Sequence, residues 1–101
     1  MILEIATLDV KAGQSAAFAS AFRTAQEIIA SMEGYLSHEL QSCLERPDRH
    51  VLLVKWRRLE DHTEGFRRSP RYQEWRQLLH HFYATTPLVE HYRLIEPQHA
   101  T

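Results

Sequence analysis

The sequence predicts an α+β domain with the element order β-α-β-β-α-β, in which a four-stranded antiparallel sheet carries helices on one face. This is the ferredoxin-like arrangement. Three observations favour it. Four short segments have the alternating or continuous apolar pattern of strands. Residues 14–31 and 59–82 have apolar side chains at helical spacing, and turn-forming residues separate most of these segments.

The first half of the fold follows from residues 1–34. Residues 1–10 form the first strand, and apolar residues at both odd and even positions indicate that it is covered on both faces. Gly13 marks a turn. Residues 14–31 form a helix that Gly34 can end in a left-handed conformation. Its apolar stripe contains Phe18, Phe22, Ala25, Ile29 and Met32.

A hairpin follows. Residues 35–44 alternate, with Leu36, His38, Leu40 and Leu44 on one face of the strand. A turn at residues 46–48 leads to the strand of residues 50–57, which is apolar on both faces.

The last part returns to helical spacing. Residues 59–67 form a short helix, and Ser69 and Pro70 begin a second one as N-cap and first helical residue. Residues 85–87 end it. The final strand covers residues 88–96, and a polar tail covers 97–101.

Length and composition define a broad class. With 101 residues, the chain predicts one domain (1–101) with a core in about residues 2–95. The sequence has no apolar run long enough for a membrane span and no secretory signal, so we expect a cytoplasmic protein without membrane contact. The single Cys43 fits a reducing compartment. The sequence has no Cys-x-x-Cys or His-x-x-x-His pattern, so no metal site is expected.

Charge argues against nucleic acid as a partner, because the net charge is only -1. Seven of the twelve basic residues nevertheless lie between positions 55 and 76, interleaved with acidic residues. This pattern favours a solvated, ion-paired helix face. A site for an anionic substrate is the alternative.

The second face of the sheet needs a cover. Helices can cover only one face, yet the first and third strands are apolar on both. A large exposed apolar patch is uncommon on a monomer. We therefore expect a homodimer that closes through the sheet faces.

Residues 54–92 hold seven of the ten aromatic rings and four of the seven histidines. Aromatic side chains at helical spacing are usually core, but an aromatic-lined cavity would also suit a flat ligand. The expected core and pocket wall consists of Trp56, Phe66, Tyr72, Trp75 and Phe82.

In residues 2–95 the chain resembles the antibiotic biosynthesis monooxygenase (ABM) domains of the dimeric α+β barrel group. The resemblance rests on an ordered set of short segments. They are Gly13-Gln14, Gly34-Tyr35-Leu36, Leu52-Leu53-Val54-Lys55-Trp56, Leu59-Glu60-Asp61-His62, Gly65-Phe66-Arg67, Ser69-Pro70, Tyr72, Trp75, Leu78-Leu79-His80-His81-Phe82-Tyr83 and Pro87-Leu88-Val89-Glu90-His91-Tyr92.

The resemblance implies a homodimer with a pocket between sheet and helices in each subunit. It also implies oxidation of a small aromatic or quinol-like ligand without a cofactor. Other relatives degrade haem with a Trp and an iron-ligating His, but Phe66 and Arg76 stand at those positions here, so haem is not expected. Relatives of both kinds also place an Asn near the pocket, whereas this sequence contains none.

Oxygenation without a cofactor needs a base and a hydrogen-bond donor. The catalytic candidates are His38, His62 and Tyr92. His38 is the one large polar residue on an apolar strand face, and His62 lies four residues before Phe66 on a helix. A structural role is the alternative for each of the three.

Further histidines are candidates for substrate binding. His80 and His81 point about 100° apart on a helix, so only one can face a ligand, and the helical stripe favours His81. His91 and Tyr92 are neighbours in a strand, so one of them faces inward.

Two other functions fit the same sequence. The dimer could bind a small ligand without chemistry, as a sensor does, or the pocket could be filled by its own side chains.

Overall fold

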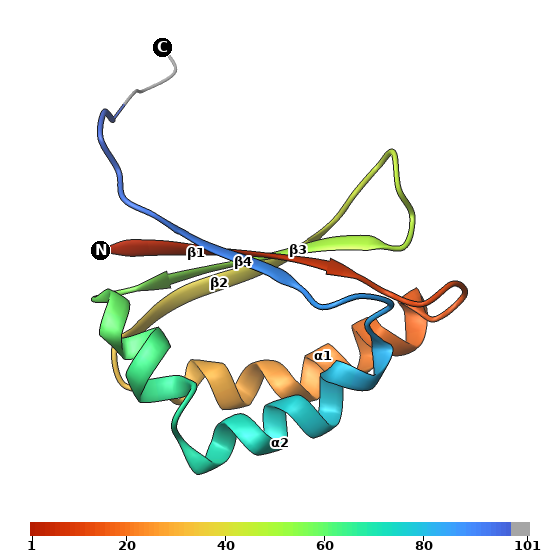
Figure 1. The fold of residues 1–101 in the computed structure, drawn as a ribbon, viewed down its shortest axis with the longest axis horizontal. Helices are drawn as coiled ribbons and strands as arrows, with labels where there is room; N and C mark the ends of the chain where they lie inside the picture. The colour runs from red at the N-terminus through yellow and green to blue at the C-terminus, as the bar shows by residue number, and fades with distance from the viewer. Residues whose placement is uncertain (98–101) are drawn as a thin grey trace.

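The computed structural model describes residues 1–97, so most of the predicted tail, residues 98–101, lies outside the described part of the chain. The order of elements is the one expected from the sequence (Figure 1). The elements are β1 (Ile2–Asp9), α1 (Ser15–Ala30), β2 (Tyr35–Ser42), β3 (Arg49–Trp56), the π-helix η1 (Asp61–Phe66), α2 (Pro70–Leu79), the 3-10 helix η2 (His80–Phe82) and β4 (Leu88–Tyr92).

The four strands form one antiparallel sheet in the order β2-β3-β1-β4. Figure 1 shows α1 and α2 side by side on one face of this sheet. The predicted ferredoxin-like α+β class is therefore confirmed. Within one chain the sheet is open and does not close into a barrel, because β2 and β4 are both edge strands. No helix in residues 1–97 is long and apolar enough to cross a membrane.

The core lies between the sheet and the helices. β1 directs its even-numbered residues toward the helices, and β3 does the same from His50 to Trp56. The register pairs Glu4 with Val54 and Ala6 with Leu52, so both central strands present one layer of side chains. From the helix side, Phe18, Phe22 and Trp75 pack against this layer.

Strand β2 differs from the sequence prediction in two places. The ladder to β3 shifts between Tyr35 and Ser37, which leaves Leu36 as the extra residue of a bulge. Leu36 is therefore exposed, while Tyr35 joins His38 and Leu40 on the helix side. The strand ends at Ser42, and Leu44 is fully exposed in the following loop, so the predicted four-residue face is wrong at both of its ends.

The connection from β3 to α2 contains the π-helix η1. The amide of Arg67 donates to the carbonyl of His62, five residues earlier. The Asp61 carboxylate accepts a hydrogen bond from the amide of Arg58. It also packs directly against the α-carbon of Gly34, whose φ is +84°. The contact between Gly34 and Asp61 therefore fixes the position at which η1 begins relative to the sheet.

The outer face of the sheet, opposite the helices, is partly exposed. It carries partly exposed apolar residues from the central strands, together with Leu88 and Tyr92 from β4. In Figure 1 the segment after β4 extends on this side, away from the helices. This segment contains Leu94 and Ile95, which are 67% and 92% exposed. We call this surface the outer sheet face, defined by Leu3, Ile5, Val51, Leu53, Leu88 and Tyr92.

Candidate functional site

A cavity of about 210 Å³ lies between the inner face of the sheet, η1 and α2. Its wall combines apolar side chains with a few polar groups, as ligand sites commonly do. The residues that line it are Glu4, Ala6, Leu8, Ile29, Leu52, His62, Phe66, Arg67, Tyr72, Trp75, His80, Tyr83, Thr86, Pro87 and Val89.

Glu4 is the most unusual group in this wall. It lies in the middle of β1 among apolar neighbours, and only 4% of it is exposed. The indole Nε1 of Trp56 donates a hydrogen bond of 2.9 Å to Glu4 Oε1. Burial raises the pKa of the Glu4 carboxyl to about 7, although the Trp56 hydrogen bond and the charge of Arg67 act in the opposite direction. Near neutral pH this carboxyl can therefore both take up and release a proton.

His62 stands beside Glu4. Its Nε2 lies 3.4 Å from Glu4 Oε1, and its ring stacks on Trp56 with a centroid distance of 5.4 Å. Burial, together with the nearby Arg67 and His91, lowers the pKa of His62 to about 3. His62 is thus neutral at physiological pH, so the pair with Glu4 is not a permanent ion pair.

His91 completes a polar row. Its Nε2 lies 2.7 Å from Nδ1 of His62, a hydrogen-bond distance between two imidazoles. His62 uses opposite ring nitrogens toward Glu4 and His91. The atoms of the row that could act as metal ligands therefore do not converge on one point. Consistent with this, residues 1–97 contain no group of three or more His, Cys, Asp or Glu that could hold a metal ion.

Arg67 supplies the positive charge at this end of the cavity. Its charge lowers the pKa values of Glu4, His62 and His91. Several of its neighbours form ion pairs instead. Arg68 pairs with Glu64 and Arg71 with Glu74 on the surface, and Arg58 pairs with the buried Asp61. The predicted ion-paired face is therefore present, but Arg67 belongs to the cavity wall.

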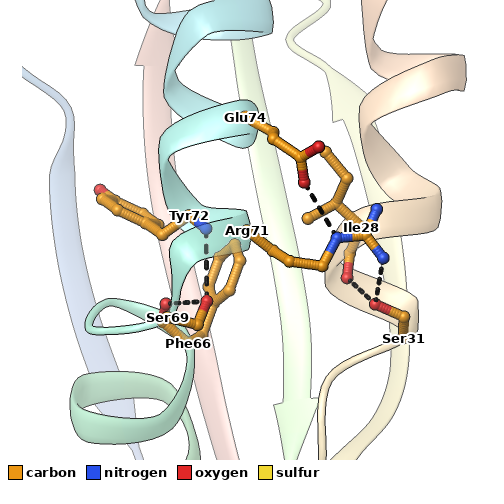
Figure 2. A network of polar contacts seen from close by, with 7 residues as sticks. All are labelled: Ile28, Ser31, Phe66, Ser69, Arg71, Tyr72 and Glu74. Atoms are coloured by element: carbon orange, nitrogen blue, oxygen red, sulfur yellow. Dashed lines mark hydrogen bonds and ion pairs between the residues drawn. The ribbon is translucent and has the colours of Figure 1, made fainter.

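The aromatic part of the wall is held by the start of α2. Ser69 is the N-cap predicted from the sequence, since its Oγ accepts from the amide of Tyr72 and donates to the carbonyl of Phe66 (Figure 2). Figure 2 also shows Arg71 joining Glu74 to Ser31 at the end of α1. These contacts fix Phe66 and Tyr72, whose rings meet edge to face at 5.1 Å.

His38 lies at the other edge of the sheet and does not line this cavity. Both of its ring nitrogens have partners: Nδ1 is hydrogen-bonded to the hydroxyl of Tyr35, and Nε2 lies 2.9 Å from Oε1 of Gln26. This matches the structural alternative for His38, a partly buried histidine at a strand edge. Its catalytic role stays a prediction.

The other candidates divide between the two faces. Of the neighbours in β4, His91 faces inward, while Tyr92 lies on the outer sheet face with its hydroxyl donating to Glu90. The orientation predicted for His81 is wrong. α2 ends at Leu79 and the chain continues as the 3-10 helix η2, which turns His80 into the cavity wall and leaves His81 exposed.

The aromatic candidates fall into two groups, those that line the cavity and those that lie in the core. Phe66, Tyr72 and Trp75 line the cavity, as expected of pocket residues. Trp56 and Phe82 are core residues behind it, and Trp56 acts on the site through its contacts with Glu4 and His62.

Sequence reasoning missed Glu4, although a signal was present. Two carboxylates, Glu4 and Asp9, stand within a strand that was predicted to be covered on both faces, and Glu4 is the one that lies well inside it, between Leu3 and Ile5. A fully buried carboxyl group is rare without a partner or a function. The strand assignment alone could therefore have identified Glu4 as a candidate.

Comparison with known proteins was made by sequence and by structure. The family model described as antibiotic biosynthesis monooxygenase matches residues 1–78. The chain is 50% identical over 93 residues to the uncharacterized protein YczJ of Bacillus subtilis (strain 168). The aligned region covers 92% of this chain and 98% of that protein.

Solved structures show the same fold. A Bordetella bronchiseptica protein assigned to the antibiotic biosynthesis monooxygenases superimposes with a TM-score of 0.90 at 32% identity, covering 94% of this chain and 97% of that one. SnoaB of Streptomyces nogalater, a cofactor-independent oxygenase, superimposes with a TM-score of 0.81 at 16% identity, covering 95% and 94%. At that level of identity SnoaB supports the fold alone.

Proposed function

Because the chain belongs to the antibiotic biosynthesis monooxygenase family, we propose that it is a cofactor-independent monooxygenase that oxidises a small phenol or quinol with dioxygen. Glu4 acts as the general base in this proposal, and His62 supports it. The assignment replaces His38 as the favoured base, because Glu4 lines the cavity and His38 does not. The oxygenase activity named for SnoaB agrees with this choice of chemistry.

The reaction balances with dioxygen as the only co-reactant. Glu4 removes a hydroxyl proton of the phenol or quinol, and a ring carbon that carries hydrogen, opposite or next to the resulting phenolate oxygen, bonds to dioxygen. Two electrons pass from the ring to oxygen, and the peroxide anion takes up one proton. Loss of water removes the hydrogen of that carbon together with the outer oxygen, so the O–O bond breaks and a quinone remains.

The observation that carries the proposal is the buried Glu4 with a pKa of about 7 in an aromatic-lined cavity. A general base works best when its pKa is near the working pH. Arg67 lines the same cavity and can stabilise the phenolate that Glu4 creates. A binding protein would not need a carboxyl group whose pKa is raised at a cost in folding stability.

The cavity also limits the size of the substrate. Sites for drug-sized ligands measure about 300–1,000 Å³, whereas this cavity measures about 210 Å³. A single-ring phenol or hydroquinone fits such a space better than a polycyclic compound does. We therefore place single-ring compounds at the centre of the activity test.

The test is oxygen uptake with a panel of single-ring phenols and quinols in air. We expect uptake above a no-protein control for at least one compound, with the quinone as product. Binding without uptake, measured by calorimetry on the same panel, would instead support a sensor or binding module. Neither binding nor uptake across the panel would contradict both functions.

Arg67→Gln should lower kcat/KM about tenfold, because a charge-assisted contact to the phenolate is lost. The pH midpoint of kcat/KM should also rise, since the positive charge that lowers the pKa of Glu4 is gone. Steady-state oxygen uptake between pH 6 and 9 measures both effects. Arg68→Gln is the matched control, because Arg68 pairs with Glu64 on the surface. Equal losses in the two variants would contradict a specific role for Arg67.

The outer sheet face supports the proposal that the protein is a homodimer. Leu53→Glu places a charge at the centre of this face, on β3, and should convert a dimer into a monomer. Sedimentation velocity distinguishes the two masses. Gln73→Glu is the control, since Gln73 is exposed on α2, on the opposite side of the sheet. A parent protein that sediments as a monomer would overturn the dimer.

A further inference from the structure

A row of three titratable groups runs from the cavity to an edge of the sheet. Glu4 lies on the central strand β1 and lines the cavity. His62 lies on η1 and is buried. His91 lies on β4, an edge strand, and is only partly buried. The row therefore begins at a buried carboxyl group and ends near solvent.

The geometry of His62 makes this row continuous. Its Nε2 is 3.4 Å from Glu4 Oε1, and its Nδ1 is 2.7 Å from His91 Nε2. The stacking contact with Trp56 keeps the ring between these two neighbours. An imidazole can accept a proton at one nitrogen while it releases a proton from the other. His62 thus contacts both Glu4 and His91, which are themselves cross-strand partners in the β1–β4 ladder.

We propose that His62 and His91 form a proton relay between Glu4 and solvent at the β4 edge. This inference rests on the proposed function and assigns how the buried base exchanges protons during turnover. A base with only 4% of its surface exposed cannot pass its proton to bulk water directly.

The proton steps balance. After Glu4 takes the phenol proton, it transfers a proton to Nε2 of His62. His62 releases its Nδ1 proton to Nε2 of His91, and His91 releases its own Nδ1 proton to water. The relay has then moved one proton outward and inverted the tautomers of both histidines. When the peroxide anion takes up a proton, the same steps run inward and restore the starting tautomers.

The surroundings of His62 prevent a proton from resting on it. Burial disfavours its cationic form most, the charges of Arg67 and His91 act in the same direction, and Trp56 contributes a neutral indole. Within residues 1–97, Glu4 is the one acidic group in contact with His62. The imidazolium form of His62 is therefore short-lived, as a relay needs.

The kinetic test uses His91→Phe, which keeps a ring of similar size but removes the proton acceptor. We expect kcat to fall about tenfold in dilute buffer with KM unchanged. Added imidazole should restore much of the rate, and the solvent deuterium isotope effect on kcat should increase. Glu90→Gln is the control, because Glu90 is exposed on the same strand. A His91→Phe variant that matches the control at all buffer concentrations would overturn the relay while leaving the proposed function intact.

A second readout does not depend on turnover. In protein labelled with ¹⁵N on histidine and ¹³C on glutamate, ionisation of the Glu4 carboxyl should shift the ring nitrogens of His62 and His91 with one shared midpoint. In His91→Phe, the response of His62 should change. Independent midpoints for the three groups would overturn the relay, even if no phenol in the panel proved to be a substrate.

Discussion

Glu4→Gln should lower kcat/KM for the best phenol by about 10²–10⁴-fold, the range that a general base contributes. The substitution keeps the size of the side chain and an oxygen that can accept from the Trp56 indole. Substrate affinity and fold should therefore be retained, which calorimetry and circular dichroism can verify. An active Glu4→Gln variant would remove the basis of the proposed mechanism.

The pH dependence of kcat/KM tests the same prediction in a second way. Glu4 must be ionised to act as a base, so kcat/KM of the parent should rise as pH increases through about 7. His38→Gln is the informative comparison, because His38 is satisfied by Tyr35 and Gln26 away from the cavity. If His38→Gln lost as much activity as Glu4→Gln, the assignment made from the sequence would be the better one.

Stability should change with pH in a direction that the raised pKa determines. Glu4 retains its proton in the folded state up to about pH 7, whereas the unfolded chain loses it near 4.5. This contribution to stability is complete below pH 4.5 and is lost as the pH rises through 7. The Glu4→Gln variant lacks this contribution. The difference between the melting temperature of Glu4→Gln and that of the parent should therefore shift in favour of the variant between pH 5 and pH 8.

Gly34→Ala should destabilise the protein by about 2–5 kcal/mol. The left-handed backbone at this position costs an alanine about 1–2 kcal/mol. A β-carbon would also overlap with the Asp61 carboxylate, and such overpacking typically adds ~1–3 kcal/mol. Because Asp61 begins η1, the variant should also displace His62 and lower activity. Urea unfolding and oxygen uptake measure the two effects.

Gly13→Ala is a matched control for this variant. Gly13 also has a positive φ, +76°, but no atom lies within 4 Å of the position of its β-carbon. It should therefore lose only the backbone contribution of about 1–2 kcal/mol and keep the parent activity. Equal destabilisation of the two variants would show that the contact between Gly34 and Asp61 does not contribute to the effect of Gly34→Ala.

Much of the fold was predictable because it depends on patterns that repeat along the chain. The apolar residues on both faces of β1 and β3, the stripe of α1 and the Ser69-Pro70 start of α2 each reappear in the structure. The bulge at Leu36 was not predictable in this way. It adds one residue to a strand, and nothing in local alternation shows where the partner strand skips a pairing.

The site was predictable in part for the same reason. His62 and Phe66 were expected on one helix face, and both line the cavity. The choice between His80 and His81 failed because the helix narrows to 3-10 geometry at that point, which changes the direction of each side chain. Glu4 was overlooked although the strand assignment implied its burial, and only its place in the cavity wall beside residues of η1 and α2, which are distant in sequence, could not be seen.

The cavity and the outer sheet face lie on opposite sides of a single sheet. In a dimer that closes through the outer faces, each subunit would supply all the residues that line its own cavity. The two cavities would lie on opposite sides of the dimer. Turnover in one half should then be insensitive to occupancy of the other. Saturation would follow a simple hyperbola, and a mixed dimer with one inactivated half would work at half speed.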